Sequence, residues 1–123
     1  GDQKNEQAIE VVAATPDVKL TLNKPTDGSP LSGVSFSNNS DKGYDVGTTT
    51  WEKSADGQSG WTSDTGNAAN GTWYRATATL TAQEGYSFTG FSASVTISDY
   101  NVVVTPSPDG TTATVVATLT AAL

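Results

Sequence analysis

Carboxylates are the groups that could carry acid–base chemistry in this 123-residue chain, because the sequence contains no histidine and no cysteine. The usual general base and the thiol nucleophile are therefore excluded. A glycosidase-type pair remains, for example Glu52 with Glu84 or Asp56. Such a pair needs a cleft and one carboxyl group with a raised pKa. These carboxylates stand largely in turns, where a solvated surface is their ordinary environment, so we predict that the chain is not an enzyme.

Aspartates in polar stretches could also supply oxygen ligands to calcium, which is a hard cation. The candidates are Asp41, Asp45, Asp56, Asp64 and Asp109. Their spacing matches no calcium-loop signature, and an aspartate followed by glycine is an ordinary turn sequence. We therefore expect no cofactor, with calcium as the alternative that the acidic residues leave open.

Two tryptophans and an arginine form the best candidate for a ligand site. Trp61 stands in a polar loop among glycine and serine, and Trp73 is in phase with Arg75 on the outward side of a predicted strand. Exposed indoles stack on the apolar faces of sugars, and a guanidinium donates hydrogen bonds to sugar hydroxyls. The competing interpretation is that the loop folds back, so that its tryptophan covers an edge of the fold.

The strand that would position these residues begins near Tyr74. From there to Gln83, apolar residues alternate strictly with arginine, threonine and glutamine. This period of two predicts a half-buried β-strand, and a threonine-rich run is a poor helix former. Trp51 ends another threonine-rich strand, and we predict that its side chain packs in the core.

The remaining elements follow the same pattern along the chain. Short alternating segments, including residues 92–98, are separated by turns about every ten residues. We predict an all-β fold, an immunoglobulin-like β-sandwich of about seven to nine mostly antiparallel strands. Residues 16–123 are expected to form this single domain, and residues 1–15 a leader in which residues 8–14 could add an edge strand.

The charge of the chain limits its partners. Thirteen acidic and six basic residues give a net charge of −7, spread over many turns. Such a surface repels phosphate backbones and anionic lipid, so we expect no nucleic-acid partner. No segment reaches the roughly 20 apolar residues that cross a bilayer, so we expect no membrane insertion.

One motif resembles a known family. Trp51 is followed by a polar loop and then by Tyr-x-Ala-Thr-x-Thr-Leu-Thr-Ala-x-x-Gly-Tyr-x-Phe-x-Gly at residues 74–90. This arrangement resembles the immunoglobulin-like repeat module of large surface proteins from Gram-positive and gut bacteria, over residues 18–121. The resemblance implies an exported module, extracellular or at the cell surface, and supplies no catalytic residue. Trp61 and Trp73 depart from the pattern and are candidates for a ligand site particular to this chain.

These observations together predict a non-catalytic spacer or adhesion module of a bacterial surface or secreted protein. It would be a monomer or part of a multidomain chain, with a protein or glycan partner at the cell surface. Two alternatives stay open. The first is a carbohydrate-binding module that uses Trp61, Trp73 and Arg75. The second is a self-assembling fibre subunit, in which residues 8–14 add as a strand to a neighbour's open edge.

Overall fold

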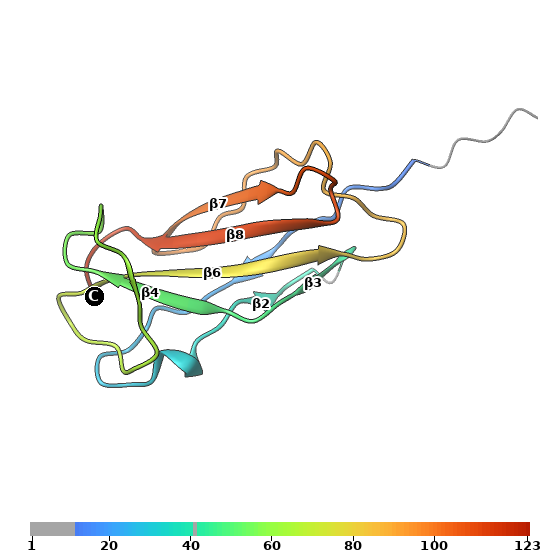
Figure 1. Ribbon diagram of the computed structural model, residues 1–123. Helices are drawn as coiled ribbons and strands as arrows, with labels where there is room; N and C mark the ends of the chain where they lie inside the picture. Colours follow the sequence, from blue (N-terminus) through green and yellow to red (C-terminus); the bar gives the residue numbers. More distant parts are fainter. Residues whose placement is uncertain (1–11, 41) are drawn as a thin grey trace, which may run out of the picture.

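The computed structural model describes residues 12–40 and 42–123, and they form an all-β sandwich (Figure 1). Its strands are β1 Leu20–Thr21, β2 Ser37–Asn38, β3 Tyr44–Val46, β4 Thr50–Ser54, β5 Thr62–Ser63, β6 Trp73–Ala82, β7 Tyr100–Pro106 and β8 Thr112–Leu119. A 3-10 turn, η2 Leu31–Gly33, is the one helical element of the described residues. The predicted all-β sandwich of seven to nine mostly antiparallel strands is confirmed.

Six of the strands form one antiparallel sheet with β6 at its centre. The order is β5-β4-β6-β8-β7, and β3 pairs with the part of β6 that β4 leaves open. Apolar and polar residues alternate along β6, and their burial alternates in the same way, because successive side chains of a strand point to opposite faces. Ala76, Ala78 and Leu80 are buried, whereas the threonines between them lie on the outer face.

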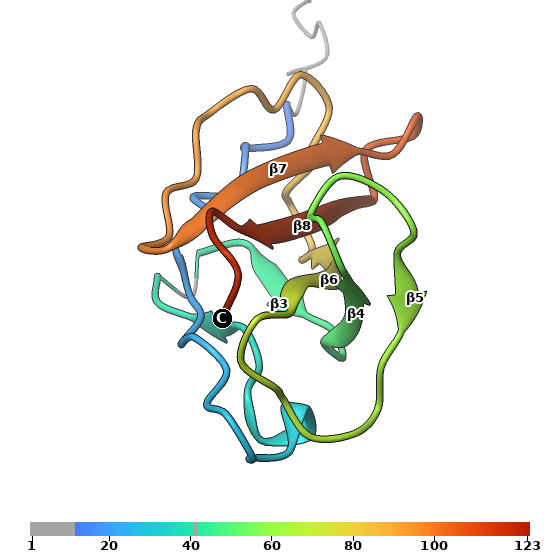
Figure 2. The same cartoon turned by 90° about the vertical axis from the view of Figure 1, so that its left-hand side faces the viewer.

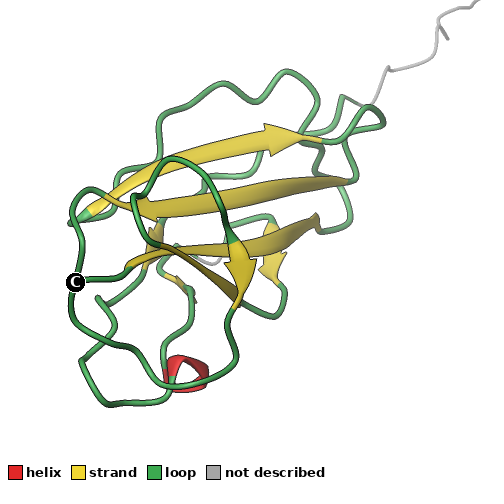
Figure 3. Ribbon diagram, turned by 60° about the vertical axis from the view of Figure 1, so that its left-hand side comes forward, coloured by secondary structure: helices red, strands yellow, loops and turns green. Residues whose placement is uncertain are grey.

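The second layer contains little regular structure. It consists of the two-stranded sheet β1-β2 and of extended segments, which lie on one side of the large sheet (Figure 2). Most of this layer is drawn as loop in Figure 3. The core fills the space between the layers. Its buried apolar residues are Val18, Leu20, Leu22, Leu31, Phe36, Tyr44, Trp51, Ala68, Tyr74, Ala76, Ala78, Leu80, Phe88, Phe91, Ile97, Tyr100, Ala113, Val115, Ala117 and Leu119.

Three buried tyrosines join the large sheet to loops and to the second layer through their hydroxyl groups. The Tyr44 hydroxyl donates to the Lys19 carbonyl and accepts from the Lys19 N–H, both at 3.0 Å. The Tyr74 hydroxyl accepts from the N–H of Ala69 at 2.9 Å. Each hydroxyl would otherwise be a buried polar group without a partner, which is costly. These bonds therefore fix the register between the large sheet and the segments packed on it.

Tyr100 completes this set. Its hydroxyl donates to the Asn23 carbonyl at 2.9 Å. Burial raises the pKa of Tyr100 well above its usual range, and the negative charge of Asp99 adds to the effect. The group is therefore a neutral hydrogen-bond donor at any physiological pH.

One sequence-based expectation, a strand at residues 92–98, is wrong, and another, a strand at residues 8–14, stays a prediction. Residues 92–98 alternate, but they form no strand, and Ile97 makes only an isolated bridge with Tyr100. The predicted strand at residues 8–14 falls mainly outside the described residues. At its described end, Ala14 forms a parallel bridge with Tyr86.

Candidate functional site

The predicted ligand residues lie at one end of the outer face of the large sheet. Glu52 of β4 stands directly opposite Arg75 of β6 in the ladder, and Glu52 is also opposite Ser63 of β5. Arg75 Nε donates to Glu52 Oε1 at 2.6 Å. Both side chains are about one-third exposed, which screens the pair only in part. The ion pair orients the guanidinium across the sheet surface.

Trp61 covers this ion pair from the loop between β4 and β5. The guanidinium carbon of Arg75 lies 4.5 Å from the centroid of the Trp61 ring, a cation–π contact. Trp61 is half-buried, so part of the indole stays open to solvent. One face of the ring is already occupied by Arg75, and at most the other face could receive a ligand.

Trp73 is covered by the same loop. A side-chain Cβ placed at Gly57 would overlap the Trp73 ring, with Cε2 at 2.8 Å, so the backbone of Gly57 lies directly against the indole. Gly57 has a φ of +75°, a conformation that glycine adopts without strain. The structure thus brings Trp61, Trp73 and Arg75 into one patch, which we call the tryptophan patch. Residues 55–60 of the loop, with Gly57 against Trp73, form its outer cover.

Hydrogen bonds inside the loop hold this cover in place. Asp56 Oδ1 accepts from the N–H groups of Gln58 at 2.9 Å and Ser59 at 3.0 Å. The hydroxyl of the buried Ser54 donates to the Ser59 carbonyl at 2.6 Å and accepts from the Gly57 N–H at 3.0 Å. The bond from Gln58, followed by that from Ser59, holds the pKa of Asp56 down to about 2.

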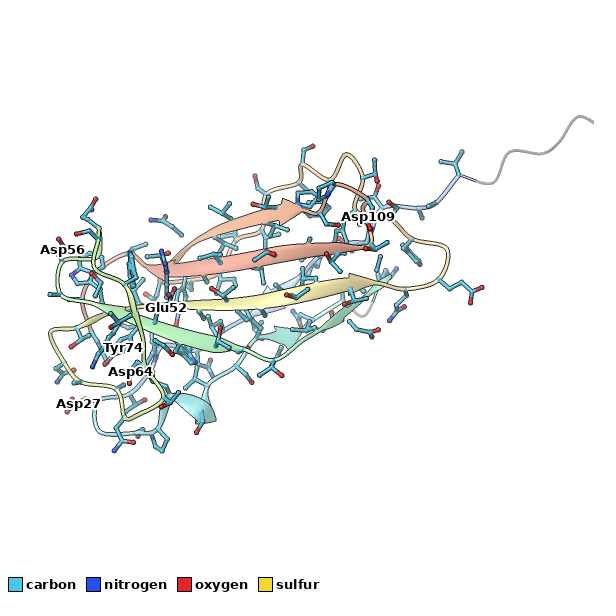
Figure 4. The ribbon with its side chains drawn as sticks, in the orientation of Figure 1. Asp27, Glu52, Asp56, Asp64, Tyr74 and Asp109 are labelled. Atoms are coloured by element: carbon cyan, nitrogen blue, oxygen red, sulfur yellow. The ribbon has the colours of Figure 1, made fainter. Side chains whose placement is uncertain are left out.

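That lowered pKa bears on the carboxylate chemistry raised by the sequence. A general acid needs a raised pKa, and the environment of Asp56 produces the opposite shift. Glu84 lies beyond the end of β6, and the seven residue steps from Arg75 to Ala82 alone span roughly 20 Å. Glycosidase pairs stand at most about 10 Å apart. Asp56 is therefore unsuited to the general-acid role. Glu84 lies too far along the chain from Glu52, whose position on β4 is shown in Figure 4, to form a glycosidase pair with it.

The described candidate calcium ligands lie in separate elements, Asp45 in strand β3 and Asp56, Asp64 and Asp109 in different turns or loops. Asp109 is at the opposite end of the sandwich from Asp56 and Asp64 (Figure 4). Asp109 accepts from the hydroxyls of Ser107 and Thr111, both at 2.8 Å, and Asp64 accepts from the Gly66 N–H at 2.9 Å. Across residues 12–40 and 42–123, no three acidic side chains gather as a metal site would require. Asp41 lies outside the described residues.

The structure also has a second outer surface, which residue types alone do not identify. Uncharged side chains of β4, β6, β7 and β8 form a continuous face next to the tryptophan patch, and we call it the threonine–valine face. Its members are Thr50, Thr77, Thr79, Val103, Thr105, Thr114 and Val116. Val103 is 61% exposed. Alternation predicts that these residues point outward, but only the order β6-β8-β7 shows that they are neighbours.

Comparisons with known proteins identify no relative of this chain. No family model matches the sequence, no curated protein matches it, and no solved structure matches its fold. In the part of the chain that the structure describes, no helix is long and apolar enough to span a membrane.

Proposed function

We propose that this domain is a non-catalytic extracellular module of a bacterial surface or secreted protein, with a spacer and adhesion role. One observation carries the proposal most strongly: the chain enters and leaves the sandwich at opposite ends of its long axis. Modules that form a spacer must pass the chain from one end to the other, because neighbours then extend the array instead of doubling back. The resemblance of residues 74–90 to surface-protein repeats supports the extracellular setting.

Backbone hydrogen bonds fix the points at which the chain enters and leaves the sandwich. On the entering side, the Ala14 N–H donates to the Gly85 carbonyl at 2.9 Å, beyond the last residue of β6. On the leaving side, the Leu123 N–H donates to the Thr72 carbonyl at 2.9 Å, just before the first residue of β6. Ten residues of extended strand separate these points by roughly 30 Å. Figure 1 shows the same separation along the sandwich.

The threonine–valine face supports the adhesion part of the proposal. The chain has a net charge of −7, yet this face carries no charged side chain. An uncharged, partly apolar surface on a charged protein is the kind of area that contacts a partner. The Glu52–Arg75 ion pair lies at one end of this face, outside its uncharged centre.

Carbohydrate binding is the second candidate, because the tryptophan patch combines an indole with an oriented guanidinium. The structure weighs against it, since Arg75 occupies one face of Trp61 and Gly57 lies on Trp73. Both tryptophans are thus explained by packing between the loop and the sheet. Part of the Trp61 surface is still accessible, so this alternative needs a direct test.

A glycan array separates the two candidates. We expect no sugar to be bound by the parent protein or by Trp61→Ala, in which the Trp73 packing is kept. Trp61→Phe, which retains a stacking ring, is the matched control, and the near-UV circular dichroism of all three proteins checks their folding. A sugar that is bound by the parent and by Trp61→Phe but lost in Trp61→Ala would replace the spacer proposal with a lectin-like function.

A further inference from the structure

A groove runs along the free edge of β1 in the second layer, and we propose that it binds an extended strand, residues 8–13, of a second copy of this chain. This inference goes beyond the spacer function. It assigns a binding site for one defined segment, and it predicts head-to-tail self-association.

The backbone hydrogen bonds of residues 17–21, which include β1, all lie on one side. The Asp17 N–H donates to the Lys42 carbonyl at 3.1 Å, and the Lys19 carbonyl accepts from the Asn39 N–H at 2.7 Å. In an antiparallel ladder, neighbouring residues turn their N–H and C=O groups to opposite sides. The backbone groups of residues 18, 20 and 22 therefore point away from β2. In the described chain, these groups have no backbone partner in another segment.

The other wall of the groove is the alternating segment 92–98, which the sequence suggested as a strand. No backbone hydrogen bond joins residues 92–96 to any other described segment. The groove between this segment and residues 16–21 has a volume of about 490 Å³, and it adjoins a second hollow of about 280 Å³ between residues 20–23 and 96–98. Two extended segments thus face each other across an open slot, each with an unused edge.

Such a slot suits an added strand better than a compact ligand. The wall that contains β1 runs from Pro16 to Asn23, eight residues or roughly 25 Å of extended chain. A six-residue strand spans roughly 20 Å and offers N–H and C=O groups on both of its edges. Insertion would satisfy both walls at once, which is how an extended peptide completes an open sheet.

Residues 8–13 have the composition that this slot requires. They read Ala-Ile-Glu-Val-Val-Ala, with Ile9, Val11 and Ala13 on one side of a strand. These side chains would face the core beside Val18 and Leu20, both of which are buried. Glu10 would fall on the exposed side, where the Lys19 amine lies 3.7 Å from the Asp17 carboxylate. The apolar alternation of the segment therefore matches the groove.

The donor must be another copy, because Ala14, the residue that follows the segment, is held away from the groove. Ala14 is fixed by two backbone hydrogen bonds, to Gly85 at 2.9 Å and from Ser87 at 2.8 Å. Turning residues 8–13 back alongside β1 would break both bonds. A neighbour's segment can enter the slot while they stay intact. Because donor and acceptor surfaces differ, the contact is heterologous, and repetition produces an open filament.

The test uses the full chain and a proline in the donor segment. In Val11→Pro the added strand loses an N–H at its centre, and proline is excluded from central strands. Asn5→Pro places the same residue upstream of the segment and is the matched control. By sedimentation velocity at physiological ionic strength, we expect the parent and Asn5→Pro to self-associate with rising concentration. For Val11→Pro we expect association weakened by about tenfold or more.

Amide hydrogen exchange locates the contact. In concentrated samples, we expect exchange at the amides of Leu20 and Leu22 to slow by about tenfold or more, whereas in Val11→Pro it stays fast at every concentration. A parent that remains monomeric at millimolar concentration would overturn the proposal. So would protection that appears at Val102 and Val104 of the edge strand β7 instead. A monomeric result does not contradict the spacer function, since that function depends on the chain entering and leaving the sandwich at opposite ends.

Discussion

Replacing Trp51 by alanine is expected to lower the free energy of unfolding by about 4 kcal/mol. The side chain is 4% exposed and meets the Tyr74 ring edge-on, with centroids 6.4 Å apart. Its Nε1–H donates to the Val34 carbonyl at 3.0 Å, a contact that joins the large sheet to the segment between η2 and β2. The substitution removes the largest core side chain and leaves that carbonyl without its partner.

Lys53→Ala is the matched control, because residue 53 is an exposed position of the same strand, two residues from Trp51. We expect it to change the free energy of unfolding by less than about 0.5 kcal/mol. Urea denaturation followed by circular dichroism measures both variants. Since single domains of this size are stable by about 5–15 kcal/mol, a loss of about 4 kcal/mol removes a large fraction of the total stability. A Trp51→Ala loss no larger than that of Lys53→Ala would mean that Trp51 is not in the core.

Replacing Gly110 by alanine is the second large effect, and we expect a loss of about 3 kcal/mol. Gly110 has a φ of +75° in the turn between β7 and β8. A Cβ there would overlap the Thr89 hydroxyl and lie 2.9 Å from the Thr89 nitrogen, so the backbone beside Phe88 must move. That movement disturbs the bond from the Phe88 N–H to the Gly110 carbonyl, which is 2.8 Å long.

Two further glycines separate the contributions of strain and overlap. Gly28 also has a positive φ, +81°, but a Cβ there meets nothing within 4 Å, so Gly28→Ala should cost only the strain of about 1–2 kcal/mol. Gly33 has neither feature, and Gly33→Ala should be close to neutral. Thermal denaturation ranks the three variants. Equal losses at positions 110 and 28 would show that residues 87–89 do not pack against the turn.

The sequence predicts the faces of strands well, because burial follows alternation directly. Alternation places Tyr74, Ala76, Ala78, Leu80 and Ala82 on one face; the first four are buried and Ala82 is half-buried against the core. Trp51 also lies in the core. Alternation reports only where side chains point. It does not show whether a neighbouring segment pairs with the backbone, which is why residues 92–98 alternate and yet form no ladder.

The same limit applies to the tryptophan patch. Alternation places Trp73 and Arg75 on the outer face, but their contacts come from a loop whose path depends on Ser54 and Asp56. The contact between Trp61 and Arg75 also needs the register that sets Glu52 opposite Arg75. Neither the loop closure nor the register could be read from residue types alone. The groove beside β1 was missed for a related reason, since it is defined by backbone groups that no side-chain pattern reveals.

One distance measurement tests directly whether the chain enters and leaves the sandwich at opposite ends of its long axis. The sequence has no cysteine, so Ala13→Cys and Ala122→Cys can carry two spin labels on exposed sites without further changes. Double electron–electron resonance on dilute, monomeric protein should give one distance of roughly 30 Å or more, set by the length of β6. A distance below about 20 Å would place the entry and the exit of the chain at the same end of β6 and would contradict the spacer function.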